Sequence, residues 1–206
     1  MIIPSTITES KGTPTGVSEK GKGVLSMISA IIYRSTTGSC EFYAREMSRK
    51  LAIPCIDAKN LKLPKGMEVI YVGWALAGKV VGLSKIQKDY DVKAVVQVGM
   101  SAVYPGAEEK CAKQNGLAGT KVFVKQGRFD INRLPLPFKL IMKAKCKEIA
   151  ERLEAKGNLN EAEQATLKMA KTGKGEPPCW DVEDVVAWEK ENRNPLDVMK
   201  WYEPID

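Results

Sequence analysis

Residues 28–40 read ISAIIYRSTTGSC, and this stretch decides the fold. Its first half, Ile28 to Tyr33, is a short apolar and β-branched run, which is typical of a strand buried in a parallel sheet. The hydroxyl-rich loop 35–39 follows, and a helical period begins at Cys40. A helix N-terminus presents unpaired N–H groups and the positive end of the helix dipole, so a loop of this kind predicts a phosphate site. The simpler interpretation is an ordinary hydroxyl-rich helix cap.

The alternation of strand and helix continues as far as residue 125. The expected elements are strand 28–33, helix 40–51, strand 54–57, strand 68–73, loop 74–78, helix 79–90, strand 92–98, loop 99–106, helix 107–115 and strand 120–125. Short links between these elements favour a parallel sheet with helices on both faces. The sequence therefore predicts an α/β fold with five parallel strands, for which a phosphate-type first loop favours the order 2-1-3-4-5.

The two ends of the chain depart from this alternation. Residues 1–26 are rich in Ser, Thr, Gly and Lys and lack the apolar core of a signal peptide. We expect them to form a disordered or non-native tail before a single domain that spans 27–206. Beyond the sheet, a helical insertion at about 130–178 precedes a last helix that flanks the sheet. The expected helices are 138–156, 161–171 with Asn160 as its cap, and 182–191.

The chain of 206 residues contains no histidine. This absence excludes a Ser-His-Asp triad, a Cys-His pair and a histidine-ligated zinc or haem. The five cysteines are scattered and form no C-x-x-C pair, so we expect no metal site and no disulfide framework. Reduced thiols are typical of the cytosol, and no apolar run approaches the roughly 18–20 residues of a membrane span. A cytoplasmic protein is expected.

Charge is distributed unevenly along the chain. The net charge is +7, but residues 176–206 hold nine acidic and three basic side chains, a balance of −6, which leaves +13 for the remainder. Such asymmetry favours anionic partners. The basic helix 138–156 either packs on its own domain with a solvated face or contacts an acidic partner protein or a membrane surface. No nucleic-acid motif is present, so no nucleic acid is expected.

The stretch from Tyr33 to Cys40, followed by Glu41 and the pair Tyr43-Ala44, resembles the signature of the flavodoxin family. That signature is a strand, then Ser/Thr-x-Thr-Gly-x-Thr, then a helix. Ser35, Thr37 and Gly38 match it, whereas Cys40 stands where a hydroxyl residue is usual. The runs 126–130 and 134–143 look like the branch of flavodoxin domains that includes the menaquinone-dependent protoporphyrinogen oxidases.

The resemblance implies a flavodoxin-like protein that binds FMN and transfers electrons to a redox partner protein or a small-molecule donor or acceptor. The alternatives are an FMN-dependent oxidoreductase acting on a porphyrinogen or quinone, and a flavodoxin-like interaction module that has lost FMN. The resemblance assigns the FMN phosphate to Ser35, Thr36, Thr37, Gly38, Ser39 and Cys40. It assigns the flavin ring to Trp74, Ala75, Leu76, Ala77, Gly78, Gly99, Met100, Ser101 and Tyr104. It assigns no catalytic residue.

Two further motifs compete for these residues. Gly73 to Lys79 fits the pattern G-x-x-x-x-G-K, but Val80 stands where a nucleotide-binding P-loop needs Ser or Thr for magnesium. Cys40 lies at a helix N-terminus, a position that lowers a thiol pKa. A phosphatase-type cysteine needs an arginine six residues later, which is absent, so a small residue at a cap is the better interpretation of Cys40.

Overall fold

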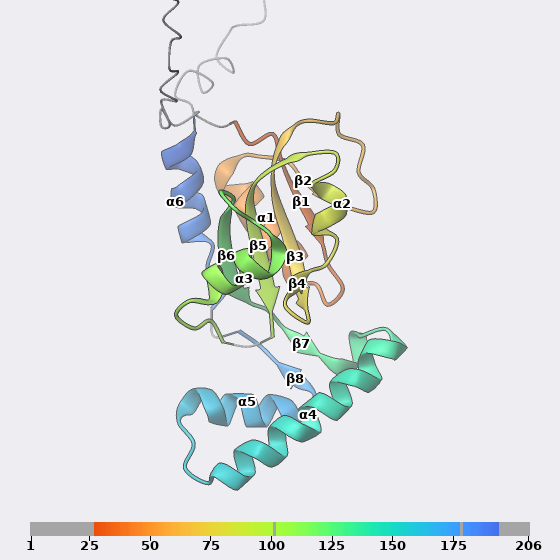
Figure 1. Ribbon diagram of the computed structural model, residues 1–206, viewed down its shortest axis with the longest axis vertical. Coiled ribbons are helices and arrows are strands. Elements are labelled where there is room, and N and C mark those ends of the chain that lie inside the picture. Colours follow the sequence, from red (N-terminus) through yellow and green to blue (C-terminus); the bar gives the residue numbers. More distant parts are fainter. Residues whose placement is uncertain (1–26, 101, 178, 194–206) are drawn as a thin grey trace, which may run out of the picture.

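The computed structural model describes residues 27–100, 102–177 and 179–193 (Figure 1). The prediction for the tail 1–26 and the prediction for Ser101 lie outside these residues. The elements are β1 (Ala30–Arg34), α1 (Ser39–Leu51), β2 (Cys55–Asp57), β3 (Glu68–Leu76), β4 (Lys79–Val80), α2 (Leu83–Ile86), β5 (Asp91–Gly99), α3 (Ala107–Asn115), β6 (Lys121–Gln126), β7 (Phe129–Asp130), the 3₁₀ turn Ile131–Arg133, α4 (Leu136–Lys156), α5 (Glu161–Thr172), β8 (Lys174–Gly175) and α6 (Glu183–Asn192).

The central sheet has five parallel strands in the order β2-β1-β3-β5-β6, and β4 pairs antiparallel with β3. The predicted α/β class with a mostly parallel sheet is confirmed. The count differs from the predicted five strands because β4 joins antiparallel as a sixth strand, and this shifts the labels of the later strands. The carboxyl ends of β1, β3 and β5 meet at one edge of this sheet, where open α/β sheets bind ligands.

Two apolar clusters cover the two faces of the sheet. Alternate residues of each strand point to opposite faces, so Ile31 packs against α1 and α6 while its neighbour Ile32 packs against α2 and α3. Two buried tyrosines make hydrogen bonds to the main chain at the edge of this core. The hydroxyl of Tyr43 donates to the carbonyl of Gln126 at the end of β6 at 2.7 Å, and that of Tyr71 donates to the carbonyl of Val81 after β4 at 2.6 Å.

The segment after Gly73 differs from the sequence-based prediction. The predicted loop 74–78 is wrong, because β3 continues to Leu76 and turns through Ala77 (φ 48°) and Gly78 (φ 81°) into β4. The predicted helix 79–90 is also wrong, because Lys79 and Val80 pair with β3 and only a single helical turn, α2, follows. Two consecutive left-handed residues form the type I′ turn that matches the twist of a hairpin.

Beyond β6 the chain leaves the sheet and forms a helical insertion, residues 129–175, which lies past the carboxyl edge of the strands (Figure 1). The short ribbon β7–β8 begins and ends it. Asn160 caps α5, its side chain accepting from the Glu163 N–H while the Glu163 carboxylate accepts from the Asn160 N–H. The predicted helices of this region are therefore present, with α4 starting two residues earlier than expected. Among the described residues, no helix is long and apolar enough to cross a membrane.

Candidate functional site: a pocket at the carboxyl edge of the sheet

A pocket lies where the ends of β1, β3 and β5 meet the first turns of α4. Its cavity volume is about 90 Å³, and all the empty space in and around it, open solvent included, is about 690 Å³. The lining residues are Thr36, Thr37, Ser39, Cys40, Trp74, Ala75, Leu76, Val98, Gly99, Met100, Gly127, Arg128, Phe129, Leu134, Phe138, Ile141 and Met142. Most of these side chains are apolar, and the polar ones gather at the loop before α1.

The hydroxyl loop (residues 35–39) turns sharply into α1. Gly38 has φ 96°, a left-handed conformation that a side chain disfavours, and its N–H donates to the Ser35 hydroxyl at 3.1 Å. No side chain caps α1, so the first N–H groups of this 13-residue helix remain for another acceptor. The exposed Thr36 hydroxyl lines the pocket and has no hydrogen-bond partner among the described residues.

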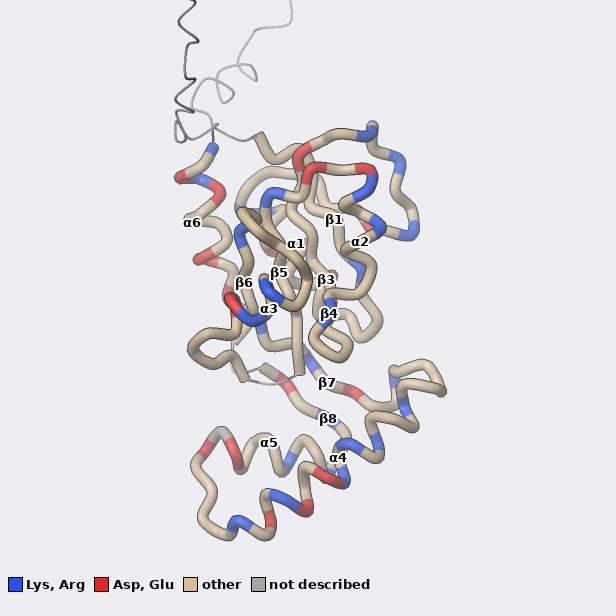
Figure 2. Tube along the Cα trace, in the orientation of Figure 1, with Lys and Arg blue, Asp and Glu red and all other residues tan. Residues whose placement is uncertain are grey.

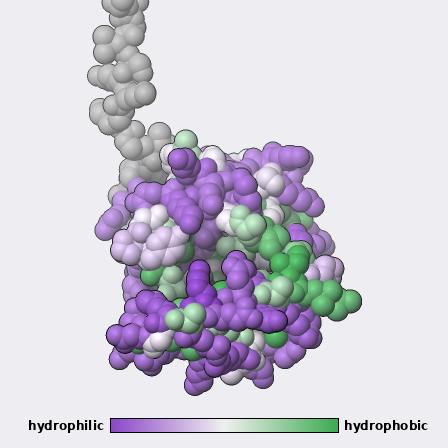
Figure 3. Space-filling model, turned by 60° about the horizontal axis from the view of Figure 1, so that its bottom comes forward, coloured by the Kyte–Doolittle hydropathy of each residue, from purple (hydrophilic) through white to green (hydrophobic). Residues whose placement is uncertain are grey.

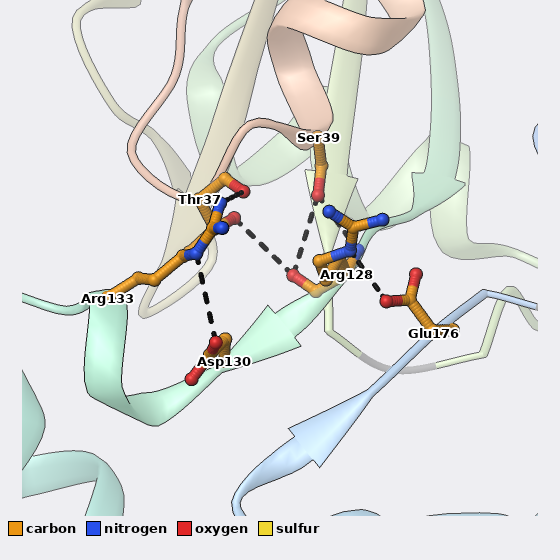
Figure 4. Close-up of polar contacts among 6 residues, drawn as sticks. All are labelled: Thr37, Ser39, Arg128, Asp130, Arg133 and Glu176. Atoms are coloured by element: carbon orange, nitrogen blue, oxygen red, sulfur yellow. Dashed lines mark hydrogen bonds and ion pairs between the residues drawn. The ribbon is translucent and has the colours of Figure 1, made fainter.

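The chain after β6 crosses over the start of α1 in the segment 127–133, here called the crossing segment (Figure 4). The Arg128 N–H donates to the Ser39 hydroxyl at 2.8 Å, and the Thr37 hydroxyl donates to the Arg128 carbonyl at 3.4 Å. A Cβ at Gly127 would lie 2.6 Å from a methyl of Val98 and 3.0 Å from the Ser39 Cβ, so only glycine fits this approach. Two hydroxyls of the loop are thus engaged by the protein itself.

The crossing segment also brings two arginines beside the hydroxyl loop (Figure 4). Arg133 donates to the carbonyl of Thr37 at 3.4 Å and lies 3.8 Å from the Asp130 carboxylate. Arg128 pairs with Glu176 at 2.6 Å. Sequence analysis missed both arginines, because the contacts span about 90 residues of chain and no local pattern reports them.

Trp74 and the first turns of α4 form the deeper part of the pocket. The rings of Trp74 and Phe138 meet edge to face, with centroids 5.9 Å apart. The indole N–H of Trp74 is buried and has no hydrogen-bond partner in the described part of the chain. A buried donor without a partner costs free energy, so this group is suited to an acceptor atom of a ligand. Sequence analysis also missed the α4 wall, because the apolar period of that helix does not tell which surface it covers.

The structure brings together most, but not all, of the residues predicted to bind FMN. Those lining the pocket are Thr36, Thr37, Ser39, Cys40, Trp74, Ala75, Leu76, Gly99 and Met100, while Ser35 and Gly38 shape the loop behind it. Ala77 and Gly78 instead form the β3–β4 turn, where the Asn115 amide of α3 donates to the Gly78 carbonyl. Tyr104 does not line the pocket; its ring is exposed and has the Lys110 ammonium 5.7 Å from its centroid.

Cys40 is a wall of the pocket rather than a reactive group. Burial raises the pKa of its thiol to about 12, so the thiol is neutral at physiological pH. The favourable position at the helix N-terminus is therefore outweighed by desolvation. Within the described residues, no group of three or more Cys, Asp or Glu side chains is arranged to hold a metal ion.

No protein-family model, no curated protein and no solved structure matches this chain. What the pocket can do follows from its own groups. Apolar walls, a buried indole donor and a mouth with hydroxyl, N–H and guanidinium groups suit a flat apolar ligand that carries an anionic end.

Proposed function

We propose that the protein is a flavodoxin-like redox protein that binds FMN and transfers electrons through the flavin. The observation that carries the proposal is the convergence on one pocket of three segments that are far apart in the chain: the loop 36–40, the end of β3 and the end of β5. The same three segments are those that the family resemblance assigns to FMN.

The mouth of the pocket suits the phosphate of FMN. The N-terminus of α1 supplies N–H donors and a positive dipole end, and the Thr36 hydroxyl adds a donor. Arg128 and Arg133 place positive charge beside the same loop. Ser39 and Cys40 have lesser roles in this proposal, since the Ser39 hydroxyl accepts from Arg128 and a thiol is a weak donor.

The apolar walls of the pocket suit the flavin ring. The cavity of about 90 Å³ is smaller than the roughly 300–1,000 Å³ that is common for ligands of this size. Trp74 and the first turns of α4 would therefore hold the ring at the open side of the pocket. Bound flavin supplies the one- or two-electron chemistry, and the side chains around it bind, orient and exclude water.

Electron transfer is favoured over catalysis on a small molecule by the residues of the pocket. Among the described residues its lining includes no Asp, Glu, Lys or Tyr, and the chain has no histidine. Burial raises the pKa of the Cys40 thiol, which lines the pocket, to about 12. No lining residue is thus suited to deliver a proton near neutral pH. A cytosolic location is part of the same proposal, because all five cysteines are free thiols.

One observation favours a second candidate, an interaction module without FMN. The hydroxyls of Thr37 and Ser39 are already hydrogen-bonded to the main chain of Arg128, and the cavity volume of about 90 Å³ is small. In such a module, the main chain of the crossing segment occupies the loop hydroxyls that would otherwise bind a phosphate. This candidate predicts that neither FMN nor riboflavin binds the folded chain.

The two candidates are separated by titrating the full chain with FMN and with riboflavin, following the quenching of flavin fluorescence. We expect FMN to bind at least about tenfold more tightly than riboflavin, because charge-assisted contacts to phosphate are strong. The variant Thr36→Ala should narrow this difference, and Lys85→Gln, on the other side of the sheet, should leave it unchanged. Equal affinity for the two ligands would remove the phosphate site from the proposal, and no binding of either would establish the module.

A further inference from the structure

The first half of α4 exposes large apolar side chains. Leu136 is 70% exposed, Leu140 61% and Ile141 63%, the highest values among the exposed large apolar side chains of the described residues. In the space-filling view, hydrophobic side chains gather at the end of the molecule where α4 begins and protrude from its rim (Figure 3). The feature is therefore a ridge, and not a groove into which a partner side chain inserts.

The spacing along α4 explains why these side chains do not join the core. Phe138, Met142 and Cys146 recur every four residues and face the pocket and the small cluster beneath the helix. Leu136, Leu140, Lys143 and Lys147 recur at steps of four, three and four, and therefore share the opposite face. This outer face combines apolar side chains at its start with lysines further along.

The charges on this stretch have one sign. From Leu136 to Lys147 the sequence has four lysines and no acidic residue, and the first carboxylate is that of Glu148. Neither Lys139 nor Lys143 has an acidic partner within the described residues. Figure 2 shows Lys and Arg positions along α4, and it shows Asp and Glu positions on α6, at the other end of the molecule.

We propose that the outer face of the first three turns of α4 docks on the surface of an anionic lipid bilayer. Leucine side chains enter the boundary between headgroups and acyl chains, while lysines keep their ammonium groups at the lipid phosphates. A second copy of the chain is a poorer occupant, because three protruding side chains supply far less than the roughly 800 Å² per partner of a stable interface. The proposal does not depend on FMN.

Docking in this way has a consequence for the pocket. Ile141 contributes both to the exposed ridge and to the lining of the pocket, and Leu76 at the end of β3 lines the pocket and is 37% exposed. The mouth therefore lies next to the surface that meets the lipid. A lipophilic electron donor or acceptor dissolved in the bilayer has a short path to the pocket.

Sedimentation of the full chain with lipid vesicles tests the proposal. We expect binding to vesicles of phosphatidylcholine with about 30% phosphatidylserine, and little binding to phosphatidylcholine alone or in about 0.5 M salt. The double variant Lys139→Gln/Lys143→Gln should lower the partition coefficient by about 25-fold, because each lysine near an anionic surface contributes about fivefold. Leu136→Gln/Leu140→Gln should lower it by about tenfold or more, since the buried apolar area is lost.

Matched controls use exposed residues away from α4. Lys85→Gln/Lys88→Gln removes the same charge and Val103→Gln removes an exposed apolar side chain, and both should bind vesicles as the parent does. No sedimentation with anionic vesicles, equal binding to neutral ones, or equal loss in the controls would overturn the proposal. If the full chain instead forms dimers that Leu136→Gln/Leu140→Gln separates, with no vesicle binding, the ridge contacts a second copy.

Discussion

The sheet with its covering helices and the helical insertion bury very different amounts of apolar side chain. The clusters on the two faces of the sheet contain many residues with no exposed surface, such as Ile31, Ile70 and Val95. The cluster of the insertion has five buried residues, none of them fully enclosed, of which Met169 is an example at 9% exposed. Three large apolar side chains of α4 lie outside any cluster.

The candidate site lies between these two regions, and each region forms one of its walls. One wall, formed by the strand ends and the hydroxyl loop, belongs to the well-packed sheet. The other wall belongs to α4, which joins the sheet through the crossing segment and the contact between Trp74 and Phe138. Regions with few buried apolar contacts open at lower free energy than the core, so the second wall is the adjustable one.

The largest expected effect is the loss of folding stability when a buried leucine is replaced by alanine. Two buried leucines have nearly equal exposure, Leu51 at 4% in α1 and Leu153 at 6% in α4. Leu51→Ala should lower the free energy of unfolding by about 2–5 kcal/mol, as is usual in a core that cannot collapse. Leu153→Ala should cost less, because the sparse cluster around it can relax. Denaturant unfolding measures both.

Amide hydrogen exchange of the same two variants tests whether the two regions open separately. Leu153→Ala should speed exchange in α4 and α5 and leave the strands of the sheet unchanged, whereas Leu51→Ala should speed exchange throughout the sheet. Uniformly faster exchange in both variants would mean that the two regions unfold as one, contrary to the comparison.

The next effect is on stability at alkaline pH. Burial raises the pKa of the Cys40 thiol to about 12, that of Cys111 to about 11 and that of the Tyr43 hydroxyl to about 12. A raised pKa means that the folded state retains a proton that the unfolded chain releases. The stability from Cys40 is therefore complete below about pH 9 and lost as pH rises towards 12, at up to about 1.4 kcal/mol per pH unit.

Denaturant unfolding between pH 8 and pH 11 checks this. Cys40→Ala should flatten the loss of stability with pH, while Cys179→Ala, at an exposed thiol, should leave the slope of the parent. An identical slope in the parent and in Cys40→Ala would show that the buried thiol does not carry the effect.

The smallest effects concern two ion pairs. Glu189 is 2% exposed on its side chain and accepts two hydrogen bonds from Arg193 at 2.8 Å, beside the sheet. Glu176 is 60% exposed and pairs with Arg128 at the crossing segment. Glu189→Gln should cost about 1–3 kcal/mol and Glu176→Gln at most about 1 kcal/mol, since exposed pairs contribute little. Thermal unfolding gives both values, and a larger cost at Glu176 would contradict this order.

The sequence predicts those parts of the fold that depend on local patterns. Apolar runs predict the buried strands β1, β3 and β5, and an alternating pattern predicts β6. Gly116 predicts the end of α3 correctly. The Asn160 cap likewise identifies the start of α5. In each case the signal lies within a few residues of the element it defines.

The errors have equally physical causes. The sequence analysis misses the β3–β4 hairpin because it interprets Ala77-Gly78 as part of a loop. The available signal is a two-residue turn that ends in glycine and follows the apolar residues 74–76. Arg128, Arg133 and Phe138 were missed at the site because their contacts with the loop and with Trp74 connect residues 64 or more positions apart. Periodicity says that a helix has an apolar face, and not what that face covers.

The central claim is that the pocket between the strand ends and α4 holds FMN, and the visible absorption spectrum of the purified full chain tests it most directly. The account predicts flavin bands, with FMN released when the protein is denatured, or the same bands after FMN is added to protein prepared without it. A colourless protein that fails to take up FMN, while remaining folded by circular dichroism, would contradict the account.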